Sequence, residues 1–115
     1  MPTTLLNDRH IHPAEFSTWA GARRYHERHR RDRQALDKLR VSIPETGILQ
    51  PLLIGVRKRD KFAFVYEGHH RAVIALELHL PAIPFQWFWD PQLRDIEAEP
   101  FPYRFLGLQP PAVNR

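Results

Sequence analysis

The chain has 115 residues, a length that favours one domain. It contains no cysteine, which excludes a disulfide framework, a thiolate zinc site and a cysteine nucleophile. Hydrophobic residues make up 43% of the chain and charged residues 26%, values typical of a globular domain. No apolar run approaches the ~20 residues of a membrane-spanning helix, and residues 1–9 do not resemble a secretion signal. We therefore expect a cytoplasmic protein without membrane contact.

Positive charge is concentrated in residues 21–40. The whole chain carries a formal charge of +4, whereas this segment holds eight basic and three acidic residues, a balance of +5. Clustered cations attract nucleic-acid phosphates, and the alternative is a solvated charged face. We expect six arginines to contact DNA or RNA: Arg23, Arg24, Arg28, Arg30, Arg31 and Arg33.

The first half of the chain predicts a short strand and two helical segments. Residues 3–6 are expected to form the strand, and a helix is expected to begin near Pro13. The apolar stripe of that helix ends between Arg23 and Gln34, so the helix either projects into solvent or breaks into a basic connector. Apolar spacing resumes at Leu36 and predicts a second helix that ends between Pro44 and Gly47.

The second half predicts three strands and one buried helix. Residues 48–54 and 62–66 are short apolar runs that we expect to pair as an antiparallel hairpin. Residues 69–79 are expected to form the helix, and residues 83–89 the last strand of one mixed sheet. The prediction is a single α/β domain of the α+β arrangement over residues 1–89. Residues 90–115 are proline-rich and are expected to form an arm that packs against the domain or a protein partner.

The segment Glu67-Gly68-His69-His70-Arg71 lies between a predicted strand and the buried helix. The first turn of a helix presents unpaired N–H groups that bind phosphate oxygens. Arg71, His69 and His70 add cationic donors at an end where they oppose the helix dipole, which favours an anion site over a simple helix cap. Glu67 is a candidate ligand for a divalent cation such as Mg²⁺.

Two motifs resemble the ParB N-terminal domain. Residues 36–43 followed by Gly47-Ile48-Leu49-Gln50-Pro51-Leu52 resemble the family's helix and its Gly-Leu-Leu-Gln-Pro-Leu strand entry. Gly68-His69-His70-Arg71 then falls where the family carries its Gly-Glu-Arg-Arg phosphate motif, and the resemblance covers residues 33–88. It implies the fold shared with sulfiredoxins, and a nucleotide-phosphate pocket lined by Gln50, Gly68, His70 and Arg71.

Two positions depart from the patterns of this superfamily. Val73 stands where the second arginine of the partition proteins would fall, so the resemblance does not carry over their CTP switch. His69 stands where sulfiredoxins have their catalytic cysteine, which excludes sulfinic-acid repair. The resemblance leaves either ATP or CTP as the nucleotide.

Three functions are consistent with these features. The first is a DNA-associated domain that binds nucleotide or nucleic-acid phosphate at residues 68–71. The second is a nuclease or a Mg²⁺-dependent phosphotransferase, with Glu67 holding the ion and His69 acting as general acid or base. The third is a non-catalytic, phage-type interaction factor that uses the arm and the basic face.

Two histidine pairs, His10-x-His12 and His26-x-x-His29, have spacings that metal sites use. The sequence offers no cysteine and no acid at ligand spacing beside either pair. We interpret these four residues as surface histidines.

Overall fold

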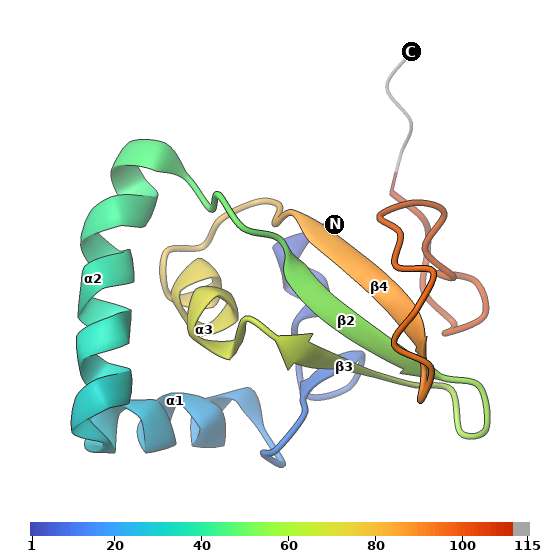
Figure 1. Ribbon diagram of the computed structural model, residues 1–115, viewed down its shortest axis with the longest axis horizontal. Coiled ribbons are helices and arrows are strands. Elements are labelled where there is room, and N and C mark those ends of the chain that lie inside the picture. The colour runs from blue at the N-terminus through green and yellow to red at the C-terminus, as the bar shows by residue number, and fades with distance from the viewer. Residues whose placement is uncertain (112–115) are drawn as a thin grey trace.

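The computed structural model describes residues 1–111 and contains one sheet with three α-helices (Figure 1). The sheet has the strand order β1-β3-β2-β4. In chain order the elements are a 3-10 helix Thr3–Leu5, β1 Ile11–Pro13, α1 Trp19–Arg28, α2 Arg30–Thr46, β2 Leu52–Arg57, β3 Phe62–Glu67, α3 His69–Glu77 and β4 Phe85–Asp90.

The sheet is mixed, as the sequence predicts. β2 and β3 form the antiparallel hairpin, with Gly55 opposite Phe64, and β4 lies parallel to the other side of β2. β1 pairs in parallel with β3. The two central strands therefore come from one hairpin, and β3 leads directly into α3 through Gly68.

The core lies on one face of this sheet. Side chains alternate along a strand, so Leu52, Ile54 and Val56 of β2 share a face, and Phe85 and Trp87 of β4 join them in register. The apolar face of α3 packs here, with residues 72–75 buried in the same cluster. The β2–β3 hairpin and the buried helix thus hold the β3–α3 turn between two packed elements.

Residues 91–111 complete the core. Phe101, Tyr103 and Leu108 are buried in the same cluster as α3, and the Phe101 ring packs edge-on against Phe85 and Trp87. Two backbone hydrogen bonds join Glu97 to Trp87 along the outer edge of β4. The segment, orange-red in Figure 1, therefore packs against the body of the domain and protects an edge strand.

The basic connector between the two N-terminal helices is a single residue. α1 ends at Arg28 and α2 begins at Arg30, with His29 in extended conformation between them.

Arg40 of α2 connects the three helices through hydrogen bonds. It donates one to Glu27 of α1 and two, at 2.8 and 2.9 Å, to the two carboxylate oxygens of Glu77 in α3. These bonds raise the Arg40 pKa and lower the Glu77 pKa. The two helices make a corner beside α3 (Figure 1).

The structure corrects three sequence predictions at the ends of elements. The predicted strand at residues 3–6 is a 3-10 helix, and the first strand is Ile11–Pro13. The first helix begins at Trp19 rather than near Pro13, because Thr18 accepts the Gly21 N–H and caps it there. β2 begins after Pro51, since proline has no N–H for the ladder, and it extends to Arg57.

None of the helices in residues 1–111 has the length and apolar composition needed to cross a membrane.

Candidate functional site

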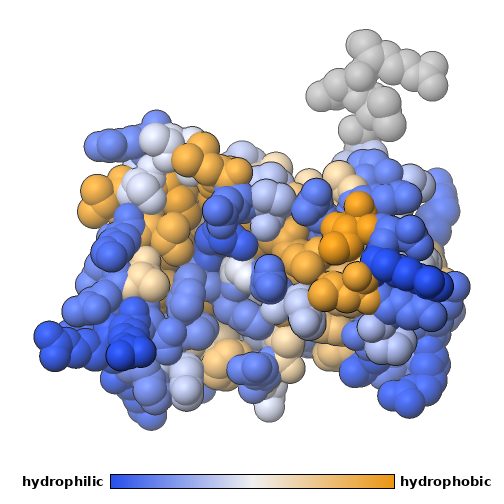
Figure 2. All heavy atoms as spheres, viewed as in Figure 1, coloured by the Kyte–Doolittle hydropathy of each residue, from blue (hydrophilic) through white to orange (hydrophobic). Residues whose placement is uncertain are grey.

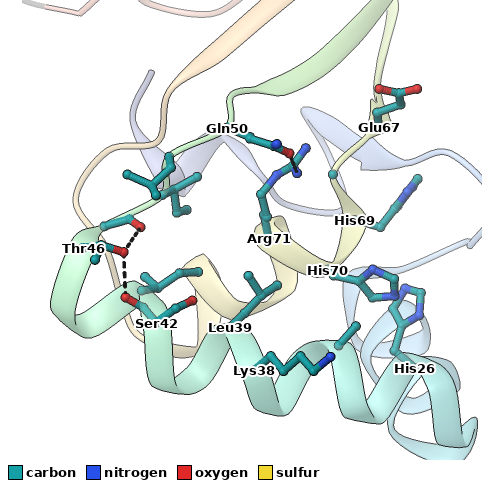
Figure 3. A pocket seen from close by; sticks show the side chains of 16 residues that line it. His26, Lys38, Leu39, Ser42, Thr46, Gln50, Glu67, His69, His70 and Arg71 are labelled. Carbon is teal, nitrogen blue, oxygen red and sulfur yellow. Dashed lines mark hydrogen bonds between the residues drawn. The ribbon is translucent and has the colours of Figure 1, made fainter.

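A cavity of about 740 Å³ lies between α2, the segment that leads into β2, and the first turn of α3 (Figure 3). α2 contributes one wall, from Ala35 to Thr46, and residues 47–50 continue it. The opposite wall is the β3–α3 turn, Glu67 to Arg71. The cavity therefore brings together the two motifs on which the family resemblance rests.

Gly68 shapes the turn that presents α3. Its φ of 103° lies in the left-handed region, which residues with a Cβ avoid. A Cβ at this position would lie 2.6 Å from Leu52 Cδ2 and 2.9 Å from Arg71 Nη2. The helix has no side-chain cap, and within the described residues the amides of His69, His70 and Arg71 donate no hydrogen bond. Three free donors and the positive end of the helix dipole thus meet at this turn.

Arg71 lies across Gly68 and connects α3 to the entry of β2. Its Nη1 donates to Gln50 Oε1 at 3.0 Å and its Nη2 to the Pro51 carbonyl at 3.3 Å. Its Nε is buried without a partner in the described part of the chain. Figure 3 shows Gln50 and Arg71 side by side at the cavity. The side chain is therefore held in place by its neighbours.

Glu67 and His69 are directed away from Arg71 (Figure 3). His69 Nε2 accepts the Ala14 N–H at 3.1 Å, so this nitrogen is unprotonated and the ring proton of the neutral imidazole is on Nδ1. Burial, together with the charge of His26, lowers the His69 pKa. Glu67 is exposed at the end of β3. The structure therefore does not bring these two side chains together with Arg71 at one point in the cavity.

His70 points toward α1 and α2, where it meets residues that sequence reasoning did not group with it. His70 Nε2 lies 2.9 Å from Asp32 Oδ1, and the His26 ring centroid is 4.5 Å from that of His70. The prediction that His26 is a surface histidine is wrong, because the residue is 6% exposed. Burial and the charge of His70 lower the His26 pKa, against the opposing effect of Asp32.

The six arginines predicted to bind nucleic acid differ in their surroundings. Arg23 donates to Glu77 at 3.0 Å, which ties it to α3. The other five are exposed and form no ion pair within residues 1–111: Arg24, Arg28, Arg30, Arg31 and Arg33. Hydrophilic residues cover the corner where α1 meets α2 in Figure 2. Five cations without an ion pair in the described part of the chain therefore remain available on α1 and on the first turn of α2.

Sequence reasoning missed the wall that α2 contributes to the cavity. Leu39 and Ile43 of α2 and Ile48 after its end line the cavity with apolar side chains, and Leu49, which also lines it, is 78% exposed. Lys38 adds an exposed cation on the same side. The helical spacing of Leu36, Leu39 and Ile43 predicts the helix, but this spacing is the same for a buried stripe and for a stripe that lines a cavity.

The fold and this cavity define a small α+β domain with a cationic helix N-terminus beside a partly apolar pocket. The family model described as the ParB N-terminal domain matches residues 19–87, more than half of the chain. The chain therefore belongs to the ParB N-terminal domain family, which confirms the resemblance and extends it to α1. It is accordingly a ParB-like, DNA-associated domain. No curated protein and no solved structure matches the chain.

Proposed function

We propose that this domain binds a nucleoside triphosphate in the cavity, with the phosphates at the N-terminus of α3, and contacts DNA through the α1–α2 corner. The observation that carries the proposal is the position of Arg71 beside three amides that have no hydrogen-bond partner within residues 1–111, at one end of a cavity with an apolar wall. Donors that converge in this way at a helix N-terminus are suited to phosphate oxygens.

The two ends of the cavity match the two ends of a nucleotide. Arg71 and the α3 amides supply charge-assisted hydrogen bonds, and Lys38 provides a second cation across the cavity. The apolar surface of Leu39, Ile43 and Ile48 suits the face of a base, for which burial of apolar area is favourable. A volume of about 740 Å³ is within the usual range for a small-molecule site.

Binding is better supported than catalysis. His69 Nε2, the nitrogen that would act as a base, already accepts the Ala14 N–H. Glu67 is directed away from Arg71 (Figure 3), so a Mg²⁺ ion on Glu67 would lie apart from phosphates held by Arg71. We therefore propose no reaction for this site. We propose that Mg²⁺ binds only together with the nucleotide, as the counterion of its phosphates.

Nucleoside triphosphates should raise the melting temperature, and replacing Arg71 should remove most of this effect. A charge-assisted phosphate contact is worth about 1.5–3 kcal/mol, so Arg71→Ala should weaken binding about ten- to a hundredfold. Arg71→Lys keeps the charge but loses the forked donor, and should recover part of the affinity. The measurement is a thermal-shift titration with ATP, CTP, GTP and UTP, with and without Mg²⁺, followed by calorimetry for the best ligand.

Arg59→Ala is the matched control, because Arg59 is exposed in the β2–β3 turn, outside the cavity. It should leave nucleotide affinity unchanged. The proposal fails if no nucleotide stabilises the protein, or if Arg71→Ala binds as tightly as the natural chain. Arg71→Ala also loses its bonds to Gln50 and Pro51, so affinities are compared at a temperature at which the variant is folded.

The exposed arginines should give DNA binding a strong dependence on salt. The logarithm of the binding constant falls by about 0.9 per phosphate contact for each unit of log salt concentration. Replacing Arg28, Arg30 and Arg31 by alanine should therefore reduce the slope by about 2 to 3, measured by fluorescence anisotropy on a short DNA duplex. The control, Arg59, Arg94 and Arg104 replaced together, changes the net charge equally. If the two triple variants had equal slopes of log binding constant against log salt concentration, the α1–α2 corner would make no specific contact with DNA phosphates.

A further inference from the structure

Three side chains from three helices meet at the end of the cavity that is nearest to α1. They are His26 of α1, Asp32 in the first turn of α2, and His70 in the first turn of α3. One ligand atom from each lies within 4.8 Å of the other two. The His26 and His70 rings lie together in Figure 3, with their centroids 4.5 Å apart.

His26 is the residue in this cluster that the fold does not explain. It is 6% exposed, and in the described residues neither ring nitrogen has a hydrogen-bond partner. Its Nδ1 lies 3.6 Å from Asp32 Oδ2, too far for a hydrogen bond. A buried polar group without a partner destabilises a protein, and an apolar residue would fill the position without that loss.

The other two residues have a simpler explanation that does not extend to His26. Asp32 lies at the N-terminus of α2, where a carboxylate is favoured by the helix dipole, and His70 forms a hydrogen bond with it. That pair accounts for Asp32 and His70. It leaves the His26 nitrogens buried, unpaired and beside a carboxylate and a second imidazole.

We propose that His26, Asp32 and His70 bind a divalent transition-metal ion, and that Zn²⁺ is the ion that fits best. Imidazole nitrogen and carboxylate oxygen are ordinary zinc ligands, whereas Mg²⁺ and Ca²⁺ prefer oxygen ligands alone. Zinc–ligand bonds of ~2.1 Å place tetrahedral ligand atoms roughly 3.4 Å apart. At present His70 Nε2 lies 2.9 Å from Asp32 Oδ1 and His26 Nδ1 lies 3.6 Å from Asp32 Oδ2, and one ligand atom from each residue lies within 4.8 Å of the other two, so side-chain adjustments without a change of the backbone would complete the site.

The cavity gives an ion at these side chains access to solvent and to a fourth ligand. His26 and His70 both line the cavity, and the His70 side chain is 36% exposed, which provides a route for the ion. Sites with three protein ligands keep the fourth position for water or another ligand. This metal site rests on the three side chains alone and does not depend on the proposed nucleotide.

The test is calorimetric titration of the untagged full chain with ZnCl₂, in the absence of nucleotide. We expect about one zinc ion per chain with a Kd at or below about 10 μM. Zinc should also raise the melting temperature, because it binds only the folded arrangement. Replacing zinc by Co²⁺ should give the visible absorption of a tetrahedral site.

Two variants and one control test the ligands. His26→Leu removes a ligand and fills its volume, so it should weaken zinc binding at least about 100-fold while the metal-free protein melts no lower than the natural chain. Asp32→Asn should also weaken binding. His29→Gln is the control, because His29 is outside the cluster and should leave zinc affinity unchanged. The proposal is overturned if the natural chain shows no saturable zinc binding, or if His26→Leu and Asp32→Asn bind zinc as His29→Gln does.

Discussion

Replacing Phe101 by alanine should lower the free energy of unfolding by about 3–5 kcal/mol, the range for a buried aromatic residue. Phe101 is 4% exposed and packs edge-on against Phe85, Trp87 and Tyr103. Its loss leaves a cavity between the C-terminal segment and the outer strand β4. The measurement is urea unfolding followed by tryptophan fluorescence, because Trp87 packs against Phe101 and Trp89 packs against Trp87.

Leu93→Ala is the control for this substitution, because Leu93 belongs to the same segment but is 52% exposed. It should change the stability by less than about 0.5 kcal/mol. If Phe101→Ala were as mild as Leu93→Ala, residues 91–111 would not be part of the folded core. A large effect of Phe101→Ala means that a protein partner of this segment would meet its exposed side, since the buried side is occupied by the domain.

Gly68→Ala should destabilise the protein by about 2–4 kcal/mol. The left-handed backbone conformation accounts for about 1–2 kcal/mol of this loss, and steric overlap for the rest. The overlap is with Leu52 Cδ2 and the Arg71 guanidinium, and Leu52 is fully buried at the start of β2, where it has little room to move. Denaturant unfolding measures the change.

Gly47→Ala shows what a positive φ costs where the space around the residue is open. Gly47 has a φ of 71° and a ψ of −172°, and no atom of the described residues lies within 4 Å of a Cβ built there. This backbone region is essentially restricted to glycine, so the substitution should lower the stability by about 1–3 kcal/mol without any steric overlap. A Gly68→Ala loss no larger than about 1–2 kcal/mol, the cost of its own left-handed backbone, would contradict the close packing of Arg71 over Gly68, on which the position of the proposed phosphate ligand depends.

Local sequence was sufficient to predict the elements that carry the candidate phosphate site. The β2–β3 hairpin and α3 follow from short apolar runs bounded by glycine and proline, whose conformational preferences act within a few residues. Gly68, His70 and Arg71 are near neighbours in one turn, so their common position at a helix N-terminus follows once that helix is recognised. Gln50 was placed in the same pocket by the family resemblance, and its hydrogen bond with Arg71 is consistent with that placement.

The direction of each side chain was decided by tertiary packing. His69 and His70 are adjacent in sequence, yet His69 contacts Ala14 and His70 contacts Asp32, because successive residues on a helix point in different directions. Arg23 and Arg24 likewise differ, since only Arg23 faces Glu77 of α3. The sequence does not distinguish these neighbouring arginines. Helix packing places Arg23 against a carboxylate and leaves the Arg24 side chain exposed.

Patterns within short segments predict the hairpin, the buried helix and the glycine turn that presents Arg71, because these depend on contacts between near neighbours. The fold class follows from these elements together with the family resemblance. Only the tertiary structure brought His26 of α1 and Asp32 of α2 to His70 of α3, 38 residues beyond Asp32. The tertiary structure also shows that Phe101 of the proline-rich segment packs against Phe85 and Trp87 of β4. Such contacts depend on how whole helices and strands pack, and the periodicity of one segment carries no information about which distant segment will face it.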